Sequence, residues 1–197
     1  MSAPQTPQTP IDAQKSAARR VAFVARRAAH ETRQQTGRDL AAQAQLRAAL
    51  APFGAAALAG YMAIRTEVDP LPVMAAHAGP VAVPVILGDG QPLAFHLWSV
   101  DCALIEGPFG ARVPALAQPV VPRVVIVPLV GFDARGYRLG YGGGFYDRTL
   151  ALLRAAGPLT ALGFAYDAQE MAQVPTDAYD QRLDGIVTES GLRRFAA

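Results

Sequence analysis

The residues best suited to chemistry lie in one short run, Arg138 to Arg148, with the sequence RLGYGGGFYDR. Three glycines at alternate positions lie between an arginine and a carboxylate. Because glycine lacks a Cβ atom, its N–H groups can closely approach an anion, and its φ angle can be positive. The run indicates a phosphate-binding loop, in which Arg138 grips a phosphate oxygen and Asp147 holds a magnesium ion. The alternating glycines are Gly140, Gly142 and Gly144.

The elements on either side of this run support the same interpretation. The apolar segment Val124 to Val130 predicts a buried strand, and the apolar spacing of Phe145 to Ala156 predicts a helix. The loop would therefore end at a helix N-terminus, where unpaired amides and the helix dipole favour an anion. The run matches neither GxxxxGK[ST] nor the dinucleotide pattern GxGxxG with a following acidic residue. A structural turn without a ligand, in which Asp147 only complements the helix dipole and Arg148 is its surface partner, remains an alternative.

The rest of the chain alternates between predicted helices and strands, which is typical of an α/β fold. We expect a helix from Asp12 to about Gln35, an interruption at Gly37 and a second helix from Asp39 to Leu50. Carboxyl ends of neighbouring strands meet at one edge of such a sheet, so we expect Glu67 and the glycine loop to face one crevice. The further predicted strands are Ala55–Met62, Val81–Ile86, Leu93–Trp98, Leu159–Ala165 and Gly185–Val187, with a helix at Pro70–Ala78, an irregular loop at Glu106–Pro122 and a loop at Val174–Asp180.

Composition limits the class of protein. With 197 residues and 51% hydrophobic content, the chain can form one compact domain, which we place at residues 12–197 after a disordered tail at 1–11. We find no membrane-spanning run and no signal peptide, so we expect a cytoplasmic protein without membrane partners. The net charge of +2 is too small to indicate nucleic-acid binding. The basic segment from Lys15 to Arg47 nevertheless leaves an RNA- or partner-binding module as a disfavoured alternative.

The segment from Val127 to Arg148, VPLVGFDARGYRLGYGGGFYDR, closely resembles the signature of the 5-formyltetrahydrofolate cyclo-ligase family, also called 5,10-methenyltetrahydrofolate synthetase. Further landmarks of the family follow in the right order, and the resemblance spans about Asp12 to Phe195. It implies a single-domain, three-layer α/β sandwich with a mostly parallel central sheet, similar to the ribose-phosphate isomerase and CoA transferase fold. The landmarks are Lys15, Arg19, Tyr61, Glu67-Val68-Asp69, Trp98 and the run VPTDAYDQRLDGIVTE at Val174 to Glu189.

The resemblance also implies a reaction. Members of the family convert 5-formyltetrahydrofolate to 5,10-methenyltetrahydrofolate in one-carbon metabolism, with ATP as co-substrate, Mg²⁺ as cofactor, and ADP and phosphate as products. The formyl oxygen is phosphorylated and N10 attacks the formyl carbon. Positioning and charge stabilisation dominate phosphoryl transfer, which agrees with a sequence that shows no obvious nucleophile. We expect a monomer that acts on these two small molecules and binds no nucleic acid.

Individual roles are carried over from the family onto matching positions. Lys15, Arg138 and Tyr146 would act in catalysis, and Asp147 and Asp180 would direct magnesium. Without the resemblance, Lys15 would read as a solvated helix residue and Asp180 as a brace of its loop. The ATP-binding residues would be Lys15, Arg19, Arg138, Leu139, Gly140, Tyr141, Gly142, Gly143, Gly144, Phe145 and Tyr146, and the folate-binding residues would be Met62, Glu67, Trp98, Tyr141 and Phe145.

Arginines farther along the first helix bear on the resemblance, and three other positions depart from it. Arg26 and Arg27 lie two turns beyond Arg19, and Arg27 falls where the family usually carries an arginine. Phe145 replaces a common tyrosine, Val113 stands where many relatives have glutamate before a proline, and Arg65 replaces a small residue ahead of Glu67. These departures leave a second interpretation open. The chain would then be a divergent nucleotide-binding member of the family that acts on another substrate.

Overall fold

The structure is a computed structural model that describes residues 10–195. Its first helix, α1 (Pro10–Glu31), begins two residues before the predicted start, so Asp12 lies in the first turn and is not the N-cap. The predicted tail at 1–11 was therefore wrong at its last two residues, and residues 1–9 lie outside the described part. Two further helices follow, α2 (Arg33–Thr36) and α3 (Arg38–Leu50). Gly37 separates them with a φ of 64°, as its position in the sequence predicted.

One seven-stranded sheet forms the centre of the fold. Its strands lie in the order β11-β10-β9-β6-β1-β2-β3. The neighbours from β10 to β2 pair in parallel, and the two edge strands, β11 and β3, pair antiparallel. The prediction of an α/β fold with a mostly parallel sheet is confirmed. The bounds are β1 (Leu58–Ala59), β2 (Val81–Val85), β3 (Ala94–Leu97), β6 (Val124–Val127), β9 (Thr160–Phe164), β10 (Gly185–Thr188) and β11 (Gly191–Arg194).

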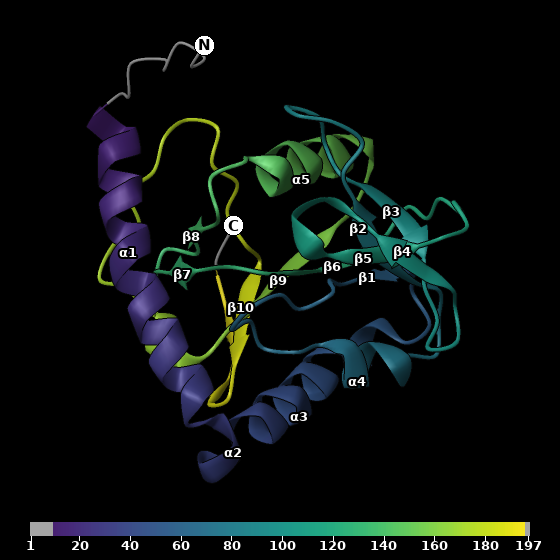
Figure 1. Ribbon diagram of the computed structural model, residues 1–197, viewed down its shortest axis with the longest axis horizontal. Coiled ribbons are helices and arrows are strands. Elements are labelled where there is room, and N and C mark those ends of the chain that lie inside the picture. The colour runs from purple at the N-terminus through teal and green to yellow at the C-terminus, as the bar shows by residue number, and fades with distance from the viewer. Residues whose placement is uncertain (1–9, 196–197) are drawn as a thin grey trace.

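Apolar side chains leave both faces of this sheet and build two cores. Along the central strand β6, Val124 and Ile126 pack into the core beneath α3 and α4 (Leu71–Ala75). Val125 and Val127 pack into the opposite core with Leu150 of α5 (Phe145–Ala156). A strand buried on both faces needs such a continuous apolar run. Figure 1 shows the resulting layers, with α5 on one side of the sheet and α3 and α4 on the other.

Helix α1 runs along one end of these layers in Figure 1, beside the hairpin of β7 (Gly131–Phe132) and β8 (Arg138–Leu139). Within residues 10–195, no helix combines the length and apolar character that crossing a bilayer requires. Arg19, in the first half of α1, donates to the Gly140 carbonyl, so this half of the helix lies against the loop before α5.

The hairpin corrects one sequence prediction. Strand β6 ends at Val127 instead of Val130, and the glycine loop leaves β8, not the long apolar strand. Buried Asp133 organises the tight turn, because its carboxylate accepts hydrogen bonds from the N–H groups of Arg135 and Tyr137 at 2.9 and 3.2 Å. The sequence analysis also missed β11 and a second hairpin, β4 (Leu104–Glu106) with β5 (Arg112–Pro114), which occupies the expected irregular loop.

Candidate active-site cleft

A cavity of about 900 Å³ opens beyond the carboxyl ends of the parallel strands. Pro128 follows β6, Met62 follows β1 and Ile86 follows β2, and all three line it. Glu67 and the whole glycine loop, Gly140 to Gly144, share the same cavity, so the prediction that they face one crevice is confirmed. The start of α1, the turn between β4 and β5, and the loop at residues 177–181 complete its wall.

The glycine loop has the backbone that its composition predicted. Gly142 and Gly144 have φ angles of 105° and 63°, which side-chain-bearing residues rarely adopt. Gly144 directly precedes α5, so the loop delivers its backbone to a helix N-terminus. A Cβ atom on Gly142 would lie 3.2 Å from the Arg19 guanidinium, whereas the space beside Gly140 is open. Only part of the loop therefore needs glycine for conformational reasons.

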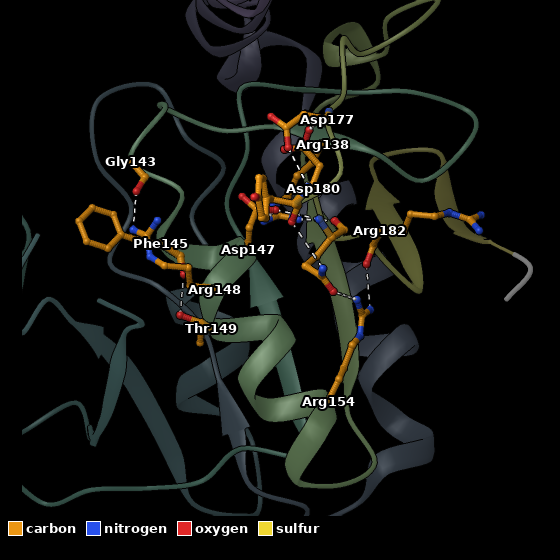
Figure 2. A network of polar contacts seen from close by, with 12 residues as sticks. Arg138, Gly143, Phe145, Asp147, Arg148, Thr149, Arg154, Asp177, Asp180 and Arg182 are labelled. Atoms are coloured by element: carbon orange, nitrogen blue, oxygen red, sulfur yellow. Dashed lines mark hydrogen bonds and ion pairs between the residues drawn. The ribbon is translucent and has the colours of Figure 1, made fainter. Parts of the chain in front are cut away.

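Arginine side chains surround this loop. The Arg19 Nε atom donates to the Gly140 carbonyl at 2.8 Å, and Arg148 Nη2 donates to the Gly143 carbonyl at 2.6 Å. The Arg148 guanidinium also lies over the Phe145 ring, 5.4 Å from its centroid, as Figure 2 shows. The sequence analysis did not assign Arg148 to the site, although its place directly after Asp147 in the motif was a signal. The two guanidinium groups make this side of the cavity electropositive.

Arg138 and Asp147 connect the two ends of the loop. Arg138 Nη2 donates to Asp147 Oδ1 at 2.8 Å, and Arg138 Nη1 donates to the Gln181 carbonyl at 2.6 Å. The Gln181 N–H donates to the same Asp147 oxygen at 2.9 Å. Figure 2 shows Arg138 beside Asp147, which belongs to the first turn of α5. The loop is thereby tied to β8, α5 and the segment after Asp180.

Lys15 of α1 also lines the cavity and pairs with two carboxylates. Its Nζ atom donates to Oδ2 of both Asp177 and Asp180, each at 2.7 Å. Burial alone would lower the pKa of Lys15, but the two aspartates together raise it above the usual 10.5. The hydrogen bond from Lys15 lowers the pKa of Asp177. Asp177 was missed by the sequence analysis, although its three-residue spacing from Asp180 could have suggested a shared cation.

Asp147 and Asp180 both line the cavity, and together they could supply two of the ligands of a magnesium ion. Each hydrogen bond described above uses one oxygen of the carboxylate, Oδ1 of Asp147 and Oδ2 of Asp180. Over residues 10–195, no group of three or more His, Cys, Asp or Glu side chains could hold a metal alone. Magnesium is usually bound through one or two carboxylates plus substrate phosphates. The two aspartates therefore suit an ion that arrives with a nucleotide.

Glu67 is buried in the part of the cavity next to Tyr141 of the glycine loop. Its Oε2 atom accepts the Ile64 N–H at 2.9 Å, and Oε1 accepts the Tyr141 hydroxyl at 3.1 Å. Burial raises the pKa of Glu67 above its usual 4.5, while these donors and Arg26 oppose the rise. Arg26 Nη1 lies 3.7 Å from Oε1. A carboxylate in this position can accept hydrogen bonds from a donor-rich ligand.

Arg26 is the largest omission of the sequence analysis, which favoured Arg27. The structure buries Arg26 beside Glu67, whereas Arg27 lies on the surface and pairs with Glu31 at 2.9 Å. The spacing of Lys15, Arg19, Ala22, Arg26 and Ala29 places these residues on one face of α1, and this pattern was the available signal.

The hydroxyl of Tyr146 is buried and has no hydrogen-bond partner. Its oxygen forms no hydrogen bond within the described residues, although the side chain lines the cavity. Burial raises the pKa of Tyr146, and the negative charge of Glu67 raises it further, so the group is a neutral donor. Leaving such a hydroxyl unsatisfied costs about 1–3 kcal/mol, which a ligand atom would recover.

The remaining predicted residues divide between the cavity and the core. Met62, Leu139 and Phe145 line the cavity. Trp98, predicted to contact folate, packs into the core beneath α3 and is not among the residues that line the cavity. Val113 is buried beside Gly107 and also lies outside that lining.

Arg65 combines a place in the lining with an unusual backbone. Its φ of 56° is the only positive value at a non-glycine position among the described residues. Its guanidinium lies 5.7 Å from the centroid of the Tyr141 ring. A non-glycine residue held at a positive φ beside a cavity indicates that the surrounding structure constrains the backbone there.

Comparison with characterised proteins gives a consistent result. A 5-formyltetrahydrofolate cyclo-ligase from Haemophilus influenzae is 37% identical over 100 residues, which cover 48% of this chain and 53% of that protein. One from Mycolicibacterium smegmatis is 29% identical over 125 residues, 60% of this chain and 58% of that protein. The chain thus spans about half the length of these curated relatives.

Solved structures extend the similarity over nearly the whole chain. The NMR structure of 5,10-methenyltetrahydrofolate synthetase from Aquifex aeolicus aligns with a TM-score of 0.71 at 28% identity and covers 93% of each chain. The synthetase from Mycoplasma pneumoniae aligns with a TM-score of 0.68 at 24% identity, covering 89% of this chain and 98% of that one, and supports the fold alone. The model of the 5-formyltetrahydrofolate cyclo-ligase family matches residues 11–189, a range that includes every element of the cleft, and the chain belongs to that family.

Proposed function

We propose that this protein catalyses the ATP-dependent cyclisation of 5-formyltetrahydrofolate to 5,10-methenyltetrahydrofolate, with release of ADP and phosphate. One observation carries the proposal: a single cavity joins an arginine-rich glycine loop to a buried carboxylate, Glu67. The loop suits a polyphosphate and Glu67 suits a ring with several N–H donors. The family match and the similarity to the Aquifex aeolicus synthetase support the same reaction.

The nucleotide would bind along the glycine loop. Amides from Gly142 to Tyr146 lie at the start of α5, where the helix dipole favours phosphate oxygens. Arg19 and Arg138 would exchange their present carbonyl and carboxylate partners for these oxygens, and Lys15 would neutralise the charge that moves during transfer. Asp147 and Asp180 would hold Mg²⁺, which screens the polyphosphate when it is bound.

The folate would bind at the other end of the cavity. Glu67 would accept hydrogen bonds from paired N–H groups of the pterin, because a carboxylate has two acceptor oxygens. Met62 and Phe145 would supply apolar surface, and Tyr141 would contact both substrates because it belongs to the loop and reaches Glu67. Phe145 has no hydroxyl and would therefore act by packing.

The reaction follows from this placement. The formyl oxygen attacks the γ-phosphorus of ATP, an O–P bond forms and ADP leaves. The N10 nitrogen then attacks the activated formyl carbon and loses its proton, the new C–N bond closes the ring, and the C–O bond breaks as phosphate departs with the formyl oxygen and takes up that proton. The protein positions the two molecules and stabilises charge, with Arg138 and Lys15 facing the phosphoryl group. The unsatisfied hydroxyl of Tyr146 would donate to the phosphoryl or formyl oxygen.

A spectroscopic assay tests the proposal. Purified protein with 5-formyltetrahydrofolate, ATP and Mg²⁺ should produce the near-ultraviolet absorption band of the methenyl product, and omission of ATP should abolish it. The exposed Asp101 offers a control, because Asp101→Asn removes an acidic group that lies outside the cavity lining and should leave the rate unchanged. A folded protein that shows no band in either condition would refute the proposal.

Arg65 favours one second candidate, a member of the family that uses the nucleotide loop on another substrate. Its long side chain lines the cavity next to Glu67 and narrows the folate end. Calorimetric titration distinguishes the two candidates. Binding of ATP without binding of 5-formyltetrahydrofolate would favour the second candidate, and Arg65→Gly should then restore space for the pterin.

A further inference from the structure

Arg26 is charged but almost completely buried, with 1% of its surface exposed. A buried charge is costly unless it is paired and hydrogen-bonded, so its contacts identify what it serves. The guanidinium packs against two neighbouring aromatic rings, 5.3 Å from the centroid of Phe23 and 5.5 Å from that of Tyr141, and the two centroids lie 5.6 Å apart. Phe23 belongs to α1 and Tyr141 to the glycine loop, so contact with both rings restricts the orientation of the Arg26 guanidinium.

The hydrogen bonds of Arg26 reach three separate segments. Nε donates to the Thr66 hydroxyl at 3.0 Å, Nη1 to the Leu129 carbonyl at 3.3 Å, and Nη2 to the Tyr141 hydroxyl at 2.8 Å. Thr66 directly precedes Glu67, Leu129 follows β6, and Tyr141 belongs to the glycine loop. A planar guanidinium with five N–H donors can donate to three acceptors in these fixed directions at once, which a lysine ammonium cannot do.

Two of these contacts lead to Glu67, one through its chain neighbour Thr66 and one through Tyr141. The Tyr141 hydroxyl accepts from Arg26 and donates to Glu67 Oε1 at 3.1 Å, so one hydroxyl connects the cation to the carboxylate. The Arg26 Nη1 atom itself lies 3.7 Å from the same oxygen. Arg26 does not line the large cavity, so it reaches a ligand there only through these neighbours.

We propose that Arg26 is a positioning residue of the folate end, which keeps Glu67 ionised and aims the Tyr141 hydroxyl at it. The inference rests on the proposed function, in which Glu67 accepts hydrogen bonds from the pterin. An ionised carboxylate offers acceptors on both oxygens, whereas a protonated one would present a donor to the N–H groups of the ligand.

Several other charged or titratable groups lie near Glu67, and each must be weighed against Arg26. Burial raises the pKa of Glu67, and the positive charge of Arg65 on the same segment opposes that rise less than Arg26 does. The hydroxyls of Tyr146 from α5 and Tyr61 after β1 lie near the same charge. Asp69, two residues along the chain, adds a negative charge close to Tyr61. Arg26 is therefore the main charged group that opposes the effect of burial on Glu67.

The test compares Arg26→Gln with Arg27→Gln, because the two variants remove the same charge from adjacent positions of α1 and Arg27 is exposed. The ¹³C resonance of the Glu67 carboxyl, identified by its absence in Glu67→Gln, reports ionisation without any ligand. Arg26→Gln should raise the pKa of Glu67 by about 1–3 units, the usual effect of losing a close opposite charge. Arg27→Gln should leave it unchanged.

The dissociation constant of 5-formyltetrahydrofolate, measured against pH, gives the functional readout. Affinity in the wild type should fall as pH drops through the pKa of Glu67, and Arg26→Gln should move this fall to higher pH by the same 1–3 units. A folded Arg26→Gln protein whose carboxyl titrates as in the wild type would overturn the inference. A wild type that fails to bind the folate would refute the proposed function instead, while the carboxyl titration still decides the role of Arg26.

A second variant covers the case in which Arg26→Gln does not fold. Thr66→Val is nearly isosteric, keeps the charge of Arg26 and removes only the acceptor of its Nε atom. Thr66 lies outside the lining of the large cavity, so the variant removes no direct contact with a ligand there. We expect the dissociation constant to rise about five- to tenfold, the value of one lost hydrogen bond. An unchanged constant would overturn the inference.

Discussion

Arg138 and Asp147 form an ion pair of 2.8 Å that joins the two ends of the glycine loop. The Arg138 side chain is buried and the Asp147 side chain is one quarter exposed. The pair uses Oδ1 of Asp147, a residue that also lines the cavity, and so holds the loop in shape at the site itself. Charged residues that organise the loop are thus the same ones that we propose to meet the nucleotide.

Asp147→Asn should lower kcat/KM about 10- to 100-fold, because one charge-assisted hydrogen bond contributes roughly 1.5–3 kcal/mol. The variant keeps the shape of the side chain but loses the charge that would hold Mg²⁺. Steady-state rates over a range of Mg²⁺ concentrations check this, and higher Mg²⁺ should restore part of the activity. An Asp147→Asn protein with wild-type rates at limiting Mg²⁺ would contradict the metal assignment.

Tyr146→Phe should separate stability from activity. The wild-type hydroxyl is buried without a partner, so its removal should leave the free energy of unfolding unchanged or raise it by about 1 kcal/mol. Turnover should fall about 100-fold if the hydroxyl donates to charge that develops in the transition state. Urea unfolding and the absorption assay measure the two effects.

Tyr166→Phe is the matched control for that experiment. Tyr166 is also buried, but its hydroxyl donates to Asp39 at 2.7 Å, far from the cavity lining. This variant should lose roughly 1–3 kcal/mol of stability and keep its turnover. If Tyr146→Phe and Tyr166→Phe lowered the free energy of unfolding equally, the Tyr146 hydroxyl would have a hydrogen-bond partner in solution, against the prediction.

Gly142→Ala should weaken both the fold of the loop and nucleotide binding. The φ of 105° disfavours alanine by about 1–3 kcal/mol, and its Cβ would press on the Arg19 guanidinium. Gly140→Ala meets open space and should change the melting temperature far less. Thermal unfolding with and without ATP compares the two variants, and equal shifts would contradict the conformational argument.

The contacts of Lys15 predict how stability depends on pH. The pKa of Asp177 is lowered from 3.8, so its contribution is present above pH 3.8 and is lost as pH falls through the lowered value. The pKa of Lys15 is raised from 10.5, so its contribution is present below pH 10.5 and is lost as pH rises through the raised value. The stability difference between wild type and Asp177→Asn, measured by urea unfolding, should therefore be constant between these limits. A difference that varies between pH 5 and 9 would show that another group controls it.

Local patterns determined much of the fold from the sequence alone. The helix at Phe145–Ala156 was predicted with its observed bounds, and the strands β9 and β10 were predicted to within one residue. These elements have strong periodicity and clear ends, so neighbouring residues decide them. Strand β1 was predicted at Ala55–Met62 but pairs at only two residues, because its length depends on the partners β2 and β6.

The sequence by itself determined the glycine loop, the family resemblance and the common crevice, since these follow from residue types and from the order of strands. Only the tertiary structure decided that Arg26 and not Arg27 faces Glu67, that Asp177 joins Asp180 on Lys15, and that Trp98 packs in the core. The pairs of Lys15 lie more than 160 positions apart in the chain. Local spacing can show which residues share one face of α1, but which distant segments that face contacts depends on how the helix packs against the rest of the fold.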